Sequence, residues 1–253
     1  MDTPVAERIA ALRAAAPLVH CITNDVTSHR VADALVALGA LPVMASAPEE
    51  VEVVARSADA LLLNCGTPSA ARWDAMRAAA AVASQRGIPV VVDPVGAGAS
   101  SSRTERARGL VSASGAIVRG NAPEVAALAG VDAVGRIRGV TAVGVPADAL
   151  PGLARSAAAA LATTVLISGP VSVASDGSRS RSLPAVPPRY PAVGLGDVLG
   201  ALVAAVACVE TDRLEAAWSA RELMDRAVDA AGTIARGPGS FWPALIDALG
   251  THR

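Results

Sequence analysis

With 253 residues, 52% of them hydrophobic, the chain has enough apolar material to bury a large core. A net charge of −1 and an aromatic content of 2% argue against a basic, base-stacking face for nucleic acid. No apolar run reaches the roughly 18 residues of a membrane-spanning helix, and the N-terminus lacks the apolar core of a signal peptide. We therefore expect a cytoplasmic protein that binds neither nucleic acid nor membrane.

The chain has no lysine, so all 22 of its Lys and Arg residues are arginine. This excludes a Walker A lysine, a Schiff base and pyridoxal phosphate chemistry. The glycines at 194, 196 and 200 do not have the spacing of the G-x-G-x-x-G dinucleotide motif, and G-x-S-x-G and H-E-x-x-H are also absent. Three widely separated cysteines without a C-x-x-C pair predict buried thiols rather than disulfides or a zinc site.

The first third of the chain alternates helices with short apolar strands. In order, we expect a helix over 2–15, a strand over 17–22, a helix between Thr27 and Gly39, a strand over 42–45 and a helix that begins within 47–51. Thr27 is expected to cap its helix. Asn24, with Thr23 and Asp25, follows the first strand, and polar side chains at the carboxyl end of a strand are well placed for ligand contact.

The middle of the chain continues this alternation with fully apolar strands. We expect a strand over 59–64, a helix over 69–86, a strand over 88–93, a helix over 103–112, a strand over 115–119 and a short helix over 124–128. Such strands, separated by helices, indicate a parallel sheet covered on both faces. Asp93 closes one strand and enters the glycine-rich turn 94–99, either as a functional carboxylate or as a turn-initiating residue before proline.

Arg119, Asn121 and Glu124 gather where the strand 115–119 ends and the next helix begins. Glu124 has a simple alternative role, which is to complement the helix dipole. Residues 130–148 give no definite pattern, and we treat them as a variable connection.

The last part of the chain predicts mostly helices. We expect a helix over 149–162, a strand over 163–168, an antiparallel hairpin formed by 171–176 and 179–183, and helices over 197–209, 212–235 and 240–249. The hairpin is the one antiparallel unit that the sequence predicts. No repeat or linker divides the chain, so residues 1–253 are expected to form a single domain.

The glycine-rich turn 193–200 runs directly into an apolar helix. Its glycines let the backbone approach a ligand, and the N-terminus of the helix favours an anion. Asp197 stands where a phosphate would be bound. On local grounds its carboxylate is either the helix N-cap or a catalytic base.

Four segments, in order, resemble the successive motifs of the hydroxyethylthiazole kinase family. They are PLVHCITN at 17–24, ALPVMASAPEEV at 40–51, DPVGAGA at 93–99 and RGNAPEV at 119–125. The resemblance implies a ribokinase-like α/β fold, a three-layer sandwich whose mostly parallel central sheet has helices on both faces. It also implies a homotrimer with interfacial active sites, which transfers the γ-phosphate of ATP to the hydroxyethyl group of 4-methyl-5-(2-hydroxyethyl)thiazole in thiamine salvage.

Roles carry over from the resemblance position by position. Met44 and Gly194 would contact the alcohol substrate, with Asn24 nearby, reached from a neighbouring subunit. Arg119 and Ser168 would contact ATP. Ser168 stands where the family usually has threonine, and it keeps the hydroxyl.

The resemblance further implies that Asp93 and Glu124 hold Mg²⁺, a cation that retains several waters and suits a pair of carboxylates. At the glycine-rich turn the family usually has Gly-Thr-Gly-Cys, whereas this chain has Gly194-Leu195-Gly196-Asp197. The wider ribokinase-like superfamily uses an aspartate there as its base, and a carboxylate accepts a proton better than a neutral thiol does. We therefore expect Asp197 to be the catalytic base, with an N-cap contribution compatible with that role. His20 is expected to be structural.

Other departures leave the substrate open. Residues near the expected substrate pocket are more polar than the family favours, namely Asp25, Ser28, His29, Arg30 and Asp33. Unless they are paired with one another, they disfavour a bare thiazole ring. One alternative is thus a kinase of another small heterocyclic alcohol, such as hydroxymethylpyrimidine. Another is a non-catalytic nucleotide or metabolite sensor, an alternative supported by Leu195 in place of threonine.

Overall fold

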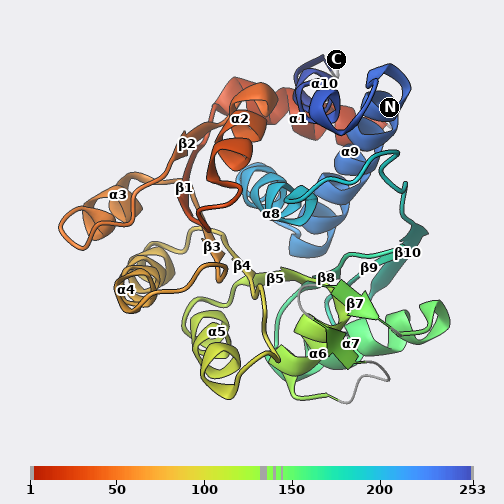
Figure 1. Ribbon diagram of the computed structural model, residues 1–253. Coiled ribbons are helices and arrows are strands. Elements are labelled where there is room, and N and C mark those ends of the chain that lie inside the picture. Colours follow the sequence, from red (N-terminus) through yellow and green to blue (C-terminus); the bar gives the residue numbers. More distant parts are fainter. Residues whose placement is uncertain (1–2, 132–135, 139–140, 144, 252–253) are drawn as a thin grey trace.

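The computed structural model describes residues 3–131, 136–138, 141–143 and 145–251. Eight strands of this part of the chain form one sheet in the order β10-β9-β8-β5-β4-β3-β1-β2 (Figure 1). Their bounds are Leu18–Ile22 (β1), Leu41–Val43 (β2), Ala60–Asn64 (β3), Val90–Asp93 (β4), Ile117–Gly120 (β5), Val165–Ile167 (β8), Val171–Ser175 (β9) and Ser180–Pro184 (β10). All neighbours from β2 to β8 are parallel, and β9 is antiparallel to both of its neighbours.

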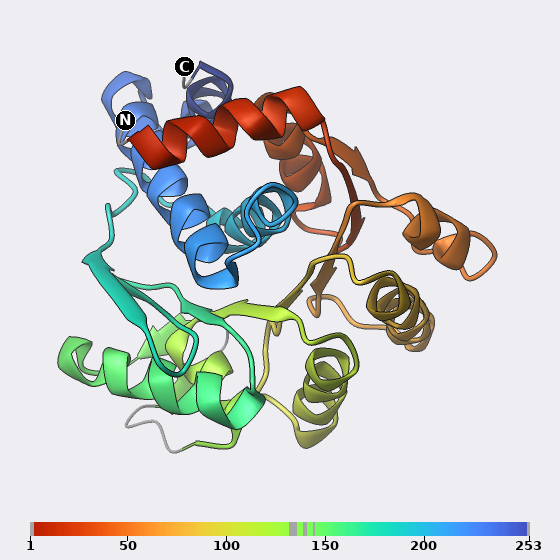
Figure 2. The same ribbon diagram turned by 180° about the vertical axis from the view of Figure 1, so that it is seen from behind.

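Helices cover both faces of the sheet, as the two views in Figures 1 and 2 show. One face carries α1 (Thr3–Ala15), α2 (Ser28–Leu38), α8 (Leu195–Val206), α9 (Arg213–Ile234) and α10 (Pro238–Thr251). The other carries α3 (Val51–Ser57), α4 (Ala70–Arg86), α5 (Ser101–Ser114), α6 (Ala122–Ala129) and α7 (Leu150–Leu161). Both faces of β3 and β4 are therefore buried, which explains why these strands are continuous apolar runs.

Helix α8 is the buried centre of the first layer. It packs on β3 and β4 and is flanked by α1, α2 and α9. Every residue from Val198 to Val206 is buried, so the helix is apolar on all sides rather than amphipathic. Gly200 allows a close approach to the sheet, because a β-carbon there would lie 3.3 Å from Leu62. This packing fixes the N-terminal end of α8, which carries Asp197, over the edge of the sheet.

The α/β fold with a mostly parallel sheet agrees with the sequence analysis, and most boundaries lie within a few residues of those expected. The expected hairpin 171–183 is present as β9 and β10, but it is not the one antiparallel unit. β9 also pairs antiparallel with β8, and β6 (Arg136–Arg138) pairs antiparallel with β7 (Thr141–Val143). Of the connection 130–148, residues 132–135, 139–140 and 144 lie outside the described residues; a short 3-10 helix, η1, covers Ala147–Ala149.

One expected cap makes no capping hydrogen bond, and one open alternative is excluded. Thr27 occupies the N-cap position of α2, but its side chain makes no capping hydrogen bond among the described residues. Asp197 is not a cap either, because Gly194 occupies the N-cap position of α8 and Asp197 lies in the first turn. The hydroxyl and the carboxylate bind each other instead, as described below. None of the described helices is long and apolar enough to span a membrane.

Candidate active site

The carboxyl ends of the parallel strands meet at one edge of the sheet and bring polar residues together there. Asn64 and Asp93 are the last residues of β3 and β4 and are register partners. Arg119 lies in β5, and Ser168 directly follows β8. Parallel strands all point to the same edge, so side chains that are far apart in sequence converge there.

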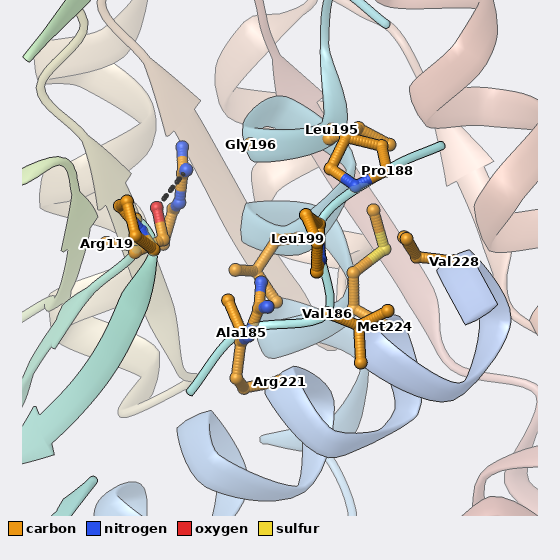
Figure 3. A pocket seen from close by; sticks show the side chains of 14 residues that line it. Arg119, Ala185, Val186, Pro188, Leu195, Gly196, Leu199, Arg221, Met224 and Val228 are labelled. Atoms are coloured by element: carbon orange, nitrogen blue, oxygen red, sulfur yellow. Dashed lines mark hydrogen bonds between the residues drawn. The ribbon is translucent and has the colours of Figure 1, made fainter. Parts of the chain in front are cut away.

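Two cavities open at this edge. The first, of about 340 Å³, we call the α9 pocket, because Arg221, Met224 and Val228 of α9 form one wall; Arg119 lies on the opposite side (Figure 3). The second, of about 310 Å³, we call the carboxylate pocket, because three acids line it, Asp93, Glu124 and Asp197. Arg119 and Gly196 line both pockets, so a ligand that occupied both would pass over these two residues.

The carboxylate of Asp197 is held by neutral hydrogen-bond donors. Thr27 Oγ1 donates to Oδ2 at 2.6 Å and Asn24 Nδ2 donates to Oδ2 at 3.1 Å, while Asn64 Nδ2 donates to Oδ1 at 2.9 Å. Gly194 permits this arrangement: its φ of +99° suits glycine, and a β-carbon there would lie 2.5 Å from Thr27 Cγ2.

Arg119 is a buried cation at the boundary between the two pockets. Its Nη1 donates to Asp93 Oδ2 at 2.7 Å, and its Nη2 donates to Ser168 Oγ at 2.6 Å. Burial raises the pKa of Asp93 to about 7; Arg119 opposes this rise, and the negative charges of Glu124 and Asp197 add to it. The guanidinium is thus fixed between a carboxylate and a hydroxyl, and it lines both pockets.

Glu124 lies in the first turn of α6, where a carboxylate complements the helix dipole as the sequence allowed, and it also caps the helix. It forms a capping box with Asn121: the Asn121 side chain accepts from the Glu124 backbone N–H, and Glu124 Oε2 accepts from the Asn121 backbone N–H at 3.0 Å. Its Oε1 accepts from the Gly96 backbone N–H at 2.9 Å. The carboxylate therefore ties the glycine-rich turn after β4 to the start of α6, and it also faces the carboxylate pocket.

The carboxylate pocket has the donor set for a hard cation. Asp93 Oδ1 is buried without a hydrogen-bond partner in the described chain, and three carboxylates face one guanidinium. Within the described residues no three His, Cys, Asp or Glu side chains are close enough to hold a metal by themselves. Two carboxylates plus oxygens from a ligand and water are a normal set for Mg²⁺, so these residues fit the cation.

Some expected residues lie elsewhere. Met44 lies just beyond β2, is 38% exposed, and is not among the described residues that line either pocket. Asp25 forms an ion pair with Arg72 at 2.6 Å. His29, Arg30 and Asp33 line a third cavity, of about 490 Å³, against α10, which we call the α10 cavity.

None of the five polar positions from 25 to 33 is therefore a lining residue of the two pockets that the described chain forms. Arg30 is bound instead to the Val193 carbonyl and stacks on Trp242, with Cζ 4.4 Å from the ring centroid. The expectation of a polar wall in the substrate pocket is not met within this chain. Residues that the carboxylate pocket presents in their place include Val26, Val95 and Val193.

Sequence reasoning assigned no role to Asn64 or Arg221. Asn64 carries the same signal as Asp93, a polar residue that closes an apolar strand, so the sequence could have pointed to it. Arg221 forms a buried ion pair with Asp225 in α9, an i,i+4 pair that is indistinguishable in sequence from an exposed one.

Solved structures share this fold. A hydroxyethylthiazole kinase protein from Pyrococcus horikoshii OT3 superposes with a TM-score of 0.87 at 35% identity, covering 97% of this chain and 92% of that one. The ADP complex of Bacillus subtilis pyridoxal kinase has a TM-score of 0.65 at 16% identity, covering 84% and 91%, and supports the fold alone. The shared fold, the site at the sheet edge and the likeness to the Pyrococcus protein define the class of the protein: a ribokinase-like α/β kinase.

The family follows from sequence comparison. The model of the hydroxyethylthiazole kinase family matches residues 9–252. Curated relatives include hydroxyethylthiazole kinases from Klebsiella pneumoniae, 45% identical over 97% of this chain and 95% of the relative, and from Nitratidesulfovibrio vulgaris, 41% identical over 96% and 91%. The chain belongs to the hydroxyethylthiazole kinase family.

Proposed function

We propose that this protein transfers the γ-phosphate of ATP to the hydroxyethyl group of 4-methyl-5-(2-hydroxyethyl)thiazole, as a step of thiamine salvage, with Asp197 as the general base. The names of its relatives support the reaction. The observation that carries the role of Asp197 is its place at the N-terminal end of α8, lining the carboxylate pocket beside the buried guanidinium of Arg119. We further propose that residues 1–253 act as one kinase domain.

The two pockets suit the two substrates. The α9 pocket is mostly apolar and adjoins Arg119 and Ser168, so it fits the nucleoside end of ATP with the phosphates directed toward Gly196. The carboxylate pocket offers valine side chains for an apolar ring and Asp197 for the hydroxyl. Because the pockets meet at Arg119 and Gly196, this placement would bring the terminal phosphate and the alcohol together beside one cation.

The chemistry follows from these positions. As the alcohol oxygen forms its bond to the γ-phosphorus, its proton passes to the Asp197 carboxylate, and the bond to the β-phosphate oxygen breaks to release ADP. Arg119 stabilises the negative charge on the phosphate oxygens. Mg²⁺, held by Asp93 and Glu124, would neutralise phosphate charge when bound. Gly194 lines the same pocket and would contact the alcohol.

A homotrimer would complete the site. Several apolar side chains are exposed: Val26 and Val193 at the carboxylate pocket, Leu41 in the edge strand β2, Met44 just beyond it, and Val53 in α3. A second copy packed on this edge would cover them, and Met44 and Asn24 could then contact an alcohol that is bound at the interface. Sedimentation equilibrium should give three times the chain mass; a monomer that is fully active would argue against an interfacial site.

The proposal is tested by ADP release with ATP, Mg²⁺ and the thiazole alcohol. Asp197→Asn should lower kcat by roughly 10²–10⁴-fold while ATP affinity is nearly unchanged, because a base acts only as the proton is transferred. Asp33→Asn, in the α10 cavity, is the matched control and should keep full activity. A full kcat in Asp197→Asn would exclude the base, and ATP binding without turnover in the unaltered protein would favour a sensor.

The polar positions at 25–33 are the main argument for a pyrimidine alcohol. Since they line neither pocket of the described chain, the structure gives that substrate no added support. A panel of both alcohols, with product masses measured, decides between them, and preference for hydroxymethylpyrimidine would overturn the thiazole assignment.

A further inference from the structure

The donors to Asp197 come from three separate parts of the fold. Asn24 lies in the loop after β1, Thr27 is the N-cap residue of α2, and Asn64 ends β3. All three side chains are buried, with exposed fractions of 6%, 1% and 0%. The Asp197 carboxylate is therefore held by the loop after β1, by the start of α2 and by the end of β3, so its rotamer does not depend on a single neighbour.

The Thr27 side chain does not make the hydrogen bond that is usual for an N-cap threonine. A threonine at an N-cap normally accepts a hydrogen bond from the helix backbone, which stabilises the helix. Here the Thr27 hydroxyl is directed at Asp197, while Asn24 Oδ1 accepts from the backbone N–H groups of Val26 and Thr27, which precede the first turn of α2. The hydroxyl has one proton. Its 2.6 Å contact with the carboxylate is shorter than its 3.2 Å contact with Asn24 Oδ1, so the proton goes to Asp197.

The contacts distinguish the two oxygens of Asp197. Oδ2 accepts from both Thr27 and Asn24, whereas Oδ1 accepts from Asn64 alone among the described residues. Each carboxylate oxygen has two lone-pair directions, so Oδ2 is filled and Oδ1 keeps one free. Amide and hydroxyl donors stay neutral at any working pH, so none of them competes for the proton that Asp197 is to accept.

We propose that Thr27 and Asn64 are positioning residues which, with Asn24, orient Asp197 so that Oδ1 is the atom that accepts the proton of the alcohol. This rests on the proposed function of Asp197 as base. In the step, the alcohol O–H bond breaks and its proton bonds to Oδ1, while the alcohol oxygen bonds to phosphorus and ADP leaves with the electron pair of the broken P–O bond. Oδ2 stays bound to Thr27 and Asn24 throughout.

Near-isosteric substitutions separate donation from packing. Thr27→Val removes the hydroxyl and keeps the shape, whereas Thr27→Ser keeps the hydroxyl. Asn64→Asp keeps the oxygen that accepts from the Gly66 backbone N–H at 2.9 Å, but it replaces the donor to Asp197 with a like charge. We expect Thr27→Val and Asn64→Asp to lower kcat at least tenfold with KM for ATP within about twofold, and Thr27→Ser to keep kcat within about threefold.

A double-substitution cycle gives the decisive comparison. If Thr27 acts through Asp197, Thr27→Val should lower kcat much less in the Asp197→Asn background than in the unaltered protein. An equal loss in both backgrounds, or equal losses for Thr27→Val and Thr27→Ser, would overturn the positioning role. ATP affinity from calorimetry checks that each variant is folded. The proposed function fails separately, if Asp197→Asn itself retains full kcat.

Discussion

The guanidinium of Arg119 lies against the α-carbon of Gly196 in the first turn of α8. A β-carbon built at Gly196 would be 2.7 Å from Arg119 Cζ and closer still to both terminal nitrogens. Both nitrogens already donate hydrogen bonds, Nη1 to Asp93 and Nη2 to Ser168. The glycine therefore allows the helix, the arginine and the acid to share the boundary between the two pockets.

Gly196→Ala should displace the guanidinium and raise KM for ATP about tenfold or more. A hydrogen bond to a charged group contributes roughly 1.5–3 kcal/mol, and the methyl group forces at least one of them apart. Steady-state kinetics at saturating alcohol measures the change. Gly109→Ala in α5 is the control, because a β-carbon there meets nothing within 4 Å; it should leave KM unchanged and stabilise the helix by up to about 1 kcal/mol.

The fold could be predicted from sequence because its strongest signal is local. Short apolar strands that alternate with helices are typical of a parallel sheet covered on both faces, and β3 and β4 carry that signal directly. The same logic placed Asp93 and Arg119 at the sheet edge. Asn64 ends β3 just as Asp93 ends β4, but neither the local pattern nor the family resemblance predicted a role for it.

What the sequence could not supply depends on partners distant in the chain. The Thr27 hydroxyl donates to Asp197, which lies far along the chain, and no local rule contains that fact. From sequence, the polar residues of α2 were expected to line the substrate pocket. The orientation of the helix turns Arg30 toward Trp242 of α10 instead. Arg221 gives no signal, because its burial comes from packing around α9.

Ser168 should be replaceable by the residue that its family usually has. Ser168→Ala removes the acceptor of Arg119 Nη2 at 2.6 Å and should raise KM for ATP by roughly tenfold, since a buried charged donor loses its partner. Ser168→Thr keeps the hydroxyl and should remain within about twofold. Equal KM values for the alanine and threonine variants would mean that the hydroxyl does not orient Arg119.

Replacing only one partner of the Arg221–Asp225 ion pair should strongly lower the free energy of unfolding. The two side chains are buried, Arg221 Nε donates to Asp225 Oδ2 at 3.0 Å, and Asp225 Oδ1 also accepts from the Val186 backbone N–H at 3.1 Å. Asp225→Leu leaves a buried guanidinium without its counter-charge and should lower the free energy of unfolding by about 3–5 kcal/mol. Arg221→Met combined with Asp225→Leu should cost less than Asp225→Leu alone.

Urea unfolding measures these differences. The exposed pair of Arg56 and Glu52, at 2.7 Å on α3, provides the comparison, and Glu52→Gln should change stability by no more than about 0.5 kcal/mol. If the free energy of unfolding falls in the double variant by the sum of the falls in Arg221→Met and Asp225→Leu, the two residues are not coupled as their geometry indicates.

The thiols should control how stability falls at alkaline pH. Burial raises the pKa of Cys21 to about 12 and that of Cys65 further still, with the negative charge of Asp93 adding to the rise at Cys65. Native thiols therefore keep their protons above pH 9, where unfolded thiols lose them, so the stabilisation is full below about pH 9 and declines as pH rises. At pH 10 the stabilisation lost is about 1.4 kcal/mol per thiol.

The absence of lysine and the single tyrosine leave few other groups that titrate in this range. Urea midpoints at pH 8 and pH 10 should differ accordingly, and the difference should shrink in Cys21→Ala combined with Cys65→Ala; an undiminished difference in that variant would assign the alkaline loss to other groups.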